Sequence, residues 1–128
     1  ALIGVGNLGS ALLKYKFHQS NSIRVSAAFD VNPEIVGRIV DGIPVYPMSD
    51  MKEQIGIQQI DIAILTVPAE HSQDVVNDLV TSGIKGILNF TPARITAPTD
   101  VLVQNVDLTT ELQTLIYFLH SGGIAPSE

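Results

Sequence analysis

Gly4-Val5-Gly6-Asn7-Leu8-Gly9 decides the fold of this chain: it reads G-x-G-x-x-G and follows directly on the apolar residues Leu2 and Ile3. The first glycine of such a stretch permits a tight turn from strand to helix, the second lets a pyrophosphate approach the backbone, and the third lets helix and strand pack closely. A helix that begins near Asn7 directs its free N–H groups at the phosphates. We therefore predict a dinucleotide-binding turn with all six residues as cofactor contacts; the alternative is a purely structural turn.

The acidic residue that this kind of turn requires is Asp30. The segment Ile23 to Asp30 alternates apolar and polar residues before Val31-Asn32-Pro33, which predicts a strand that ends at Asp30. Asp30 follows the glycines by about twenty residues, where a carboxylate accepts hydrogen bonds from the adenosine ribose. It repels the 2′-phosphate of NADP and no arginine adjoins it, so we expect Asp30 and Val31 to bind NAD(H). Without the glycines, Asp30 would be an ordinary acid that ends a strand.

Strand-like and helix-like segments alternate along the rest of the chain. Apolar runs predict strands at Ile60 to Val67, Ile84 to Asn89 and Val101 to Val106, and a shorter one around Val45. Helical spacing predicts helices at Leu8 to about Phe17, Ser49-Asp50 through Ile55, Pro68 to Thr81 and Leu108 to Leu119. The alternation indicates an α/β fold, a Rossmann-type parallel sheet with helices on both faces. The apolar run 60–67 is typical of a strand buried on both faces.

The composition fits one soluble, acidic domain that covers residues 1–128. Of the 128 residues 45% are hydrophobic, and 13 acids against 7 bases give a net charge of -6. The lack of cysteine excludes disulfides and thiolate zinc sites, and we expect no metal site. No apolar run reaches the ~20 residues of a membrane span, and the acidic balance is wrong for binding DNA phosphates. The start inside an apolar run, without methionine, indicates that an N-terminal part is missing.

Two later strands end in polar and proline-containing segments, Thr66-Val67-Pro68 and Asn89-Phe90-Thr91-Pro92. In an open α/β sheet a ligand lies beyond the carboxyl ends of the strands, at the point where the strand order reverses. We therefore expect both segments to flank the second half of the dinucleotide, with hydroxyls and the Asn89 amide as polar contacts. The alternative is structural: Pro68 is a first-turn helix proline and Pro92 a turn residue.

No residue of the chain fits a catalytic role beside the nicotinamide. His18, His71 and His120 lie in polar or terminal helix positions, where a histidine is ordinarily solvated. No Tyr-x-x-x-Lys pair, serine elbow or P-loop lysine occurs, and 128 residues leave no room for a substrate domain. The chain is therefore expected to read the cofactor rather than to be an enzyme.

The last helix, about 108–120, is apolar around more of its circumference than a surface helix needs. Its stripe consists of Leu108, Leu112, Leu115, Ile116 and Leu119, and Tyr117 and Phe118 widen it. Such a helix buries two faces, one of them against another subunit or domain; the alternative is a terminal helix packed on its own sheet. Asp107 is a natural N-cap, with Thr110 in the first turn.

Five segments together resemble a known family, the redox-sensing transcriptional repressors called Rex. They are Gly4 to Gly9, Ala28-Phe29-Asp30, Ala63 to Pro68, Gly83-Ile84-Lys85-Gly86-Ile87-Leu88-Asn89-Phe90-Thr91-Pro92, and Val106-Asp107-Leu108 to Leu119. The likeness covers nearly the whole chain, and its middle block is far more specific than a glycine motif.

The resemblance implies the NAD(H)-binding and dimerisation domain of a cytoplasmic bacterial sensor of the NADH/NAD+ ratio. Rex repressors are homodimers whose N-terminal winged-helix domain binds operator DNA and whose last helix is domain-swapped. NADH, the preferred form, releases the DNA. The resemblance also implies interface roles for Leu112, Ile116, Tyr117 and Phe118, and a redox-dependent contact between Tyr15 and Asp107; simple packing of Tyr15 is the alternative. The winged-helix half is absent, so operator DNA would bind only through that missing part.

Three other interpretations stay open at this point. A truncated NAD-dependent dehydrogenase shares the glycine turn but needs the acid–base group that we do not find. A CoA-binding Rossmann domain also shares the turn, although Asp30 disfavours the 3′-phosphate on the CoA ribose. A purely structural dimerisation module would bind no nucleotide.

Overall fold

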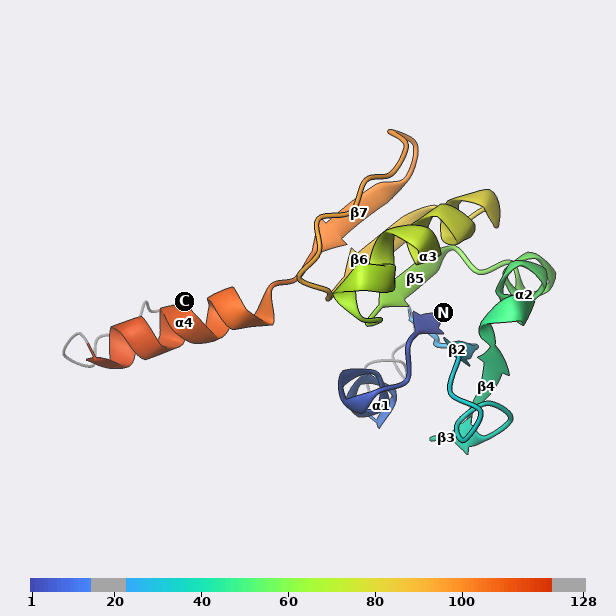
Figure 1. Cartoon of the computed structure of the whole chain (residues 1–128), viewed down its shortest axis with the longest axis horizontal. Coiled ribbons are helices and arrows are strands. Elements are labelled where there is room, and N and C mark those ends of the chain that lie inside the picture. Colours follow the sequence, from blue (N-terminus) through green and yellow to red (C-terminus); the bar gives the residue numbers. More distant parts are fainter. Residues whose placement is uncertain (15–22, 121–128) are drawn as a thin grey trace.

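The computed structural model describes residues 1–14 and 23–120, which form a seven-stranded sheet (Figure 1). The strand order is β3-β4-β2-β1-β5-β6-β7, parallel throughout except for the antiparallel pair β3 and β4. The strands are β1 (Leu2–Ile3), β2 (Ala28–Asp30), β3 (Ile39–Val40), β4 (Ile43–Pro47), β5 (Ile62–Leu65), β6 (Gly86–Asn89) and β7 (Leu102–Asn105). Strands β2, β4 and β3 lie on one side of β1, and β5, β6 and β7 lie on the other, so that the strand order reverses at β1.

Helices pack on both faces of the sheet. The helices on the sheet are α1 (Asn7–Lys14), α2 (Met51–Gln58), which the 3-10 turn η2 (Met48–Asp50) precedes, and α3 (Ala69–Thr81). A further helix, α4 (Leu108–His120), follows β7. Helices α2 and α3 bury Ile55 and Val76 against Phe29 and Leu65 in one core. Helix α1 buries Leu13 in a second core on the opposite face. The predicted α/β, Rossmann-type fold is confirmed. The predicted strands and helices agree with the described elements to within a few residues, apart from the strand Ile23 to Asp30, and the end of the first predicted helix, beyond Lys14, lies outside the described residues.

The strand Ile23 to Asp30 is shorter than predicted, and one strand was not predicted at all. Only Ala28–Asp30 pairs as β2, with β1 on one side and β4 on the other. The unpredicted strand β3 pairs with β4 through a tight turn at Asp41 and Gly42, both with positive φ. Two residues carry too little hydrophobic periodicity to be recognised as a strand.

The expectation that the run 60–67 is buried on both faces is wrong. Ala63 and Leu65 are fully buried, whereas Ile62 on the other face is 58% exposed. The face that carries α1 is covered only over the half of the sheet near β1 and β2. Because the connection from β6 to β7 contains no helix, nothing in the described chain covers β5, β6 and β7 on that side (Figure 1).

Helix α4 leaves the sheet at the end of β7 and extends away from the body of the molecule (Figure 1). It therefore does not pack on its own sheet, and that alternative is wrong. Leu112, Leu115, Ile116, Tyr117 and Leu119 are all exposed on it by 45% or more. Among the residues described, no helix is both long and apolar enough to cross a membrane.

Candidate functional site

The three glycines of the β1–α1 turn have different structural roles. Gly4 adopts φ +98, which side-chain-bearing residues rarely adopt, and its N–H donates to the carbonyl oxygen of Phe29 at 2.8 Å. A Cβ on Gly9 would overlap the carbonyl oxygen of Gly4, so only glycine lets α1 approach β1 this closely. A Cβ on Gly6 would meet no atom within 4 Å. The space in front of Gly6, at the N-terminus of α1, is thus open to a ligand.

Asp30 is bound to the glycine turn by its own carboxylate. Its Oδ2 accepts a hydrogen bond from the backbone nitrogen of Val5 at 2.6 Å, and its Oδ1 accepts one from that of Asn32 at 2.9 Å. Each carboxylate oxygen has two lone pairs, so both can still accept a bond from a ribose hydroxyl. Sequence reasoning predicted Asp30 as a ligand contact but missed this second role, because a pairing across 25 residues leaves no local signal.

Thr66, which follows β5, fastens the turn from the other side. Its hydroxyl lies 2.6 Å from the carbonyl oxygen of Gly4 and 3.1 Å from that of Ile3. Its backbone N–H donates to the Ile3 oxygen at 2.9 Å. The first of the two predicted polar segments, Thr66-Val67-Pro68, thus contacts the glycine turn directly, at the point where the strand order reverses. Val67 is half-buried, and the exposed Pro68 immediately precedes α3.

Asn89 and Thr91, in the second predicted polar segment, are buried at the same edge of the sheet. Asn89 is 1% and Thr91 8% exposed, and the Asn89 side chain makes all of its hydrogen bonds within the chain. Phe90 is half-buried and Pro92 exposed. A cavity of about 220 Å³ lies here, lined by residues 91–95 and 105–107.

The structure thus brings Gly4 to Gly9, Asp30 and Thr66 into direct contact, and places 89–92 at the carboxyl ends of the same parallel strands. The interface candidates lie elsewhere: Asp107, Leu112, Ile116 and Tyr117 are exposed at or on α4, and Phe118 is half-buried with its ring 5.4 Å from that of Tyr117. Tyr15 and His18 lie outside the described residues. Within residues 1–14 and 23–120 no cluster of metal-binding side chains occurs.

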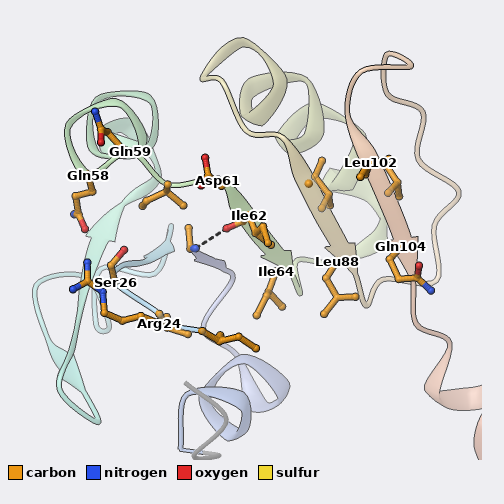
Figure 2. A pocket seen from close by; sticks show the side chains of 17 residues that line it. Arg24, Ser26, Gln58, Gln59, Asp61, Ile62, Ile64, Leu88, Leu102 and Gln104 are labelled. Atoms are coloured by element: carbon orange, nitrogen blue, oxygen red, sulfur yellow. Dashed lines mark hydrogen bonds between the residues drawn. The ribbon is translucent and has the colours of Figure 1, made fainter. Parts of the chain in front are cut away.

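A larger cavity among the described residues lies away from this edge. It is a groove of about 770 Å³ on the uncovered face of the sheet, toward the amino ends of the strands. Figure 2 shows Ile62, Ile64, Leu88 and Leu102 pointing into it, with the terminal amine of Ala1 donating to the Ile62 carbonyl oxygen at 2.8 Å. The residues that line this groove do not include the glycine turn, Asp30 or Thr66.

A glycine turn on the central strand, with an acid at the end of β2 and an open helix N-terminus, defines a nucleotide-binding domain of the Rossmann type. The family model described as "CoA binding domain" matches residues 1–93. The chain belongs to this family.

The sequence is also similar to repressors of known identity. It is 78% identical over 120 residues to the redox-sensing transcriptional repressor Rex 1 of Enterococcus faecalis, covering 94% of this chain and 56% of that protein. It is 66% identical over 123 residues to Rex of Ligilactobacillus salivarius, covering 96% of this chain and 58% of that protein. The resemblance to Rex is confirmed, and the chain spans rather more than half the length of these relatives.

Solved structures support the same relationship. RSP, a Rex-family repressor, superimposes with a TM-score of 0.88 at 34% identity, over 93% of this chain and 57% of that one. RSP has also been solved with β-NADH, with a TM-score of 0.88 over 57% of that chain, and with β-NAD+ and operator DNA, with a TM-score of 0.86 over 55% of it. In both complexes the RSP chain is again 34% identical to this chain, and each match covers 93% of this chain.

Proposed function

We propose that residues 1–128 form the NAD(H)-binding, redox-sensing and dimerisation domain of a Rex-type transcriptional repressor that responds to the NADH/NAD+ ratio in the cytoplasm. The observation that carries the proposal is the Asp30 carboxylate, held 2.6 Å from the Val5 nitrogen beside the open space at Gly6. The proposed hydrogen-bond acceptor for the ribose, Asp30, is thereby held against the proposed phosphate-binding turn before any ligand binds. The names and bound ligands of the similar repressors support the same function.

The cofactor's pyrophosphate would lie against Gly6 and the first turn of α1, where the free N–H groups and the helix dipole favour negative charge. The Ser10 N–H already bonds the Gly6 carbonyl oxygen at 2.8 Å, so the N–H groups of residues 7–9 precede the helical hydrogen bonds and remain for the phosphates. The adenosine ribose would bond to Asp30, with Val31 beside it. The nicotinamide half would run along Thr66-Val67-Pro68 toward Asn89-Phe90-Thr91-Pro92.

Redox sensing would follow from differential affinity. The oxidised nicotinamide ring is a cation and the reduced ring is neutral. An apolar, partly buried pocket therefore favours NADH, because burying the neutral ring costs less hydration free energy than burying the cationic ring. A ligand shifts a conformational equilibrium only as far as it discriminates between the two states. The proposed role is that of a sensor rather than an enzyme, and the similar proteins, which are named as transcriptional repressors, support this.

The partners that we propose are a second copy of the chain and, through the rest of the repressor, operator DNA. Helix α4 presents an apolar stripe that its own sheet does not cover, which fits a helix swapped onto a partner. The interface set is Asp107, Leu112, Ile116, Tyr117 and Phe118, together with Tyr15. The net charge of -6 disfavours contact between this domain and DNA phosphates.

Coenzyme A is the second candidate ligand, because the family description names it. CoA shares the adenine and pyrophosphate but carries a 3′-phosphate on its ribose, which would face the Asp30 carboxylate. Like charges at hydrogen-bonding distance repel strongly, so Asp30 selects against CoA and against NADP(H) for the same reason.

Calorimetric titration of the chain with NADH, NADPH and CoA tests the ligand. We expect NADH to bind at least about tenfold more tightly than either phosphorylated nucleotide, a difference of ~1.4 kcal/mol. Equal binding of NADPH would contradict the role of Asp30, tighter binding of CoA would favour the second candidate, and no binding at all would leave only a structural module.

A further inference from the structure

Asn89, the last residue of β6, uses its whole hydrogen-bonding capacity inside the molecule. Its Oδ1 accepts from the backbone nitrogen of Thr91 at 3.0 Å and from the Thr91 hydroxyl at 2.8 Å. Its Nδ2 donates to the carbonyl oxygen of Ala93 at 3.3 Å and to Oδ1 of Asn105 at 3.0 Å. A carboxamide offers two donor hydrogens and two acceptor lone pairs, so this side chain is fully satisfied.

The orientation of both amides follows from their neighbours. A backbone N–H, that of Thr91, can only donate, so the Asn89 oxygen must face it. A backbone carbonyl, that of Ala93, can only accept, so the Asn89 nitrogen faces the other way. Asn105 must then present its oxygen to Asn89, because two NH₂ groups cannot bond to each other.

The same two residues control where the chain leaves the sheet. Asn105 is the last residue of β7 and lies opposite Asn89 in the parallel register. The N–H of Val106 donates to the main-chain oxygen of Asn89 at 2.8 Å. Only Val106 and Asp107 separate this point from α4, which extends away from the sheet (Figure 1). A change in the backbone dihedral angles at Asn105 would therefore change the direction of the whole of α4 relative to the sheet.

On its other side, Asn89 holds the turn at residues 91–93, at the same edge of the sheet as the glycine turn. Thr91, Ala93 and Asn105, which its side chain bonds, all line the cavity of about 220 Å³. A ligand that displaced this turn would have to move Asn89 or break its bonds, and the two bonds to Thr91 are buried and therefore costly to break. One buried side chain thus joins the ligand-facing turn to the base of α4.

We propose that the Asn89–Asn105 pair is the positioning link that passes occupancy of the nucleotide cleft to α4. The link deepens the proposed function and rests on it. Neither side chain needs to touch the cofactor: Asn89 holds the turn, and Asn105 transfers its position to the strand end from which the helix departs.

The absence of cysteine allows α4 to be followed by site-specific labelling. Asp74→Cys on α3 and Gln113→Cys on α4 replace exposed residues and give two unique spin-label sites. Pulsed electron resonance on labelled chain diluted with unlabelled chain measures the distance from the body to α4 within one molecule. Calorimetry on the same samples measures NADH binding independently.

The decisive variant is Asn105→Leu, which removes the oxygen that accepts the hydrogen bond from the Asn89 amide, at an exposed position. It is compared with Asn105→Asp, which keeps an accepting oxygen. We expect saturating NADH to shift the label distance in the parent and in Asn105→Asp. In Asn105→Leu we expect the shift to be lost although calorimetry shows that the chain is still saturated with NADH. Gln104→Leu changes the neighbouring amide on the opposite face of β7, and it should respond like the parent.

The link is overturned if the shift persists in Asn105→Leu, if Gln104→Leu abolishes it equally, or if the parent binds NADH without any shift. Thermal melting confirms that each variant is folded. Failure of the parent to bind NADH at all is a separate result: it overturns the proposed function, and this inference with it.

Discussion

The three glycines of the β1–α1 turn differ in what the structure requires of them. Gly4 needs its positive φ, and Gly9 needs the lack of a Cβ because the Gly4 carbonyl oxygen occupies that space. Gly6 alone has no structural reason to be glycine, since nothing lies within 4 Å of a Cβ built on it. Gly6 is therefore the position at which the proposed approach of the pyrophosphate can be tested separately from the fold.

Alanine at Gly6 and alanine at Gly9 should therefore have opposite effects. Gly6→Ala keeps the melting temperature near that of the parent but weakens NADH binding by tenfold or more, a loss of at least ~1.4 kcal/mol, because a methyl group stands where the pyrophosphate approaches. Gly9→Ala overpacks the helix–strand contact and lowers the free energy of unfolding by ~1–3 kcal/mol. Thermal melts and calorimetry on both variants check this. A destabilised Gly6→Ala that still bound NADH normally would contradict the assignment.

Asp30 acts on both the ligand and the turn, so its substitutions separate the two roles. Asp30→Ala removes the ribose acceptor and leaves the Val5 N–H without its partner; we expect weaker binding of NADH and of NAD+ and a stability loss of ~1–3 kcal/mol. Asp30→Asn keeps an oxygen for Val5 and removes the negative charge. It should restore most of the stability and narrow the preference for NADH over NADPH in calorimetry. An unchanged preference in Asp30→Asn would show that the charge does not select the cofactor.

At the scale of elements, α4 is the part of the structure with the least support from its own chain. Leu112 and Ile116 lie one helical turn apart on its exposed stripe. Leu112→Glu places a charge on this stripe, and we expect it to weaken self-association by at least about tenfold in sedimentation equilibrium, since a buried charge without a partner is costly. Gln113→Glu adds the same charge beside the stripe and should change little. Equal effects of the two variants would argue against the stripe as the interface.

The sequence predicted most elements and the ligand-facing turn, because their signals are local. Apolar runs, helical spacing and the glycine turn each lie within a few residues. The features that it missed depend on the tertiary structure. The hydrogen bond from the Val5 N–H to Asp30 and the bond from the Asn89 amide to Asn105 join distant segments, and the apolar run 60–67 does not reveal which of its faces lacks a covering helix.

At the scale of the whole molecule, the described residues combine the edge at the glycine turn with two uncovered apolar surfaces. At this edge the Val5 N–H donates to the Asp30 carboxylate, and the Thr66 hydroxyl donates to the Gly4 carbonyl oxygen. The uncovered surfaces are the sheet face over β5 to β7, which Figure 2 shows lined by Ile62, Leu88 and Leu102, and the stripe of α4. Exposed apolar areas of this kind mark sites of protein contact. The architecture thus fits a sensor that is assembled with other parts.

The measurement that tests the central claim most directly is the affinity of this chain for NADH compared with NAD+, by calorimetry in one buffer. A redox sensor must discriminate between the two forms, and we predict that NADH binds at least about tenfold more tightly, equivalent to ~1.4 kcal/mol. Equal affinities for NADH and NAD+ would contradict the claim, because a ligand pair without differential affinity shifts no equilibrium.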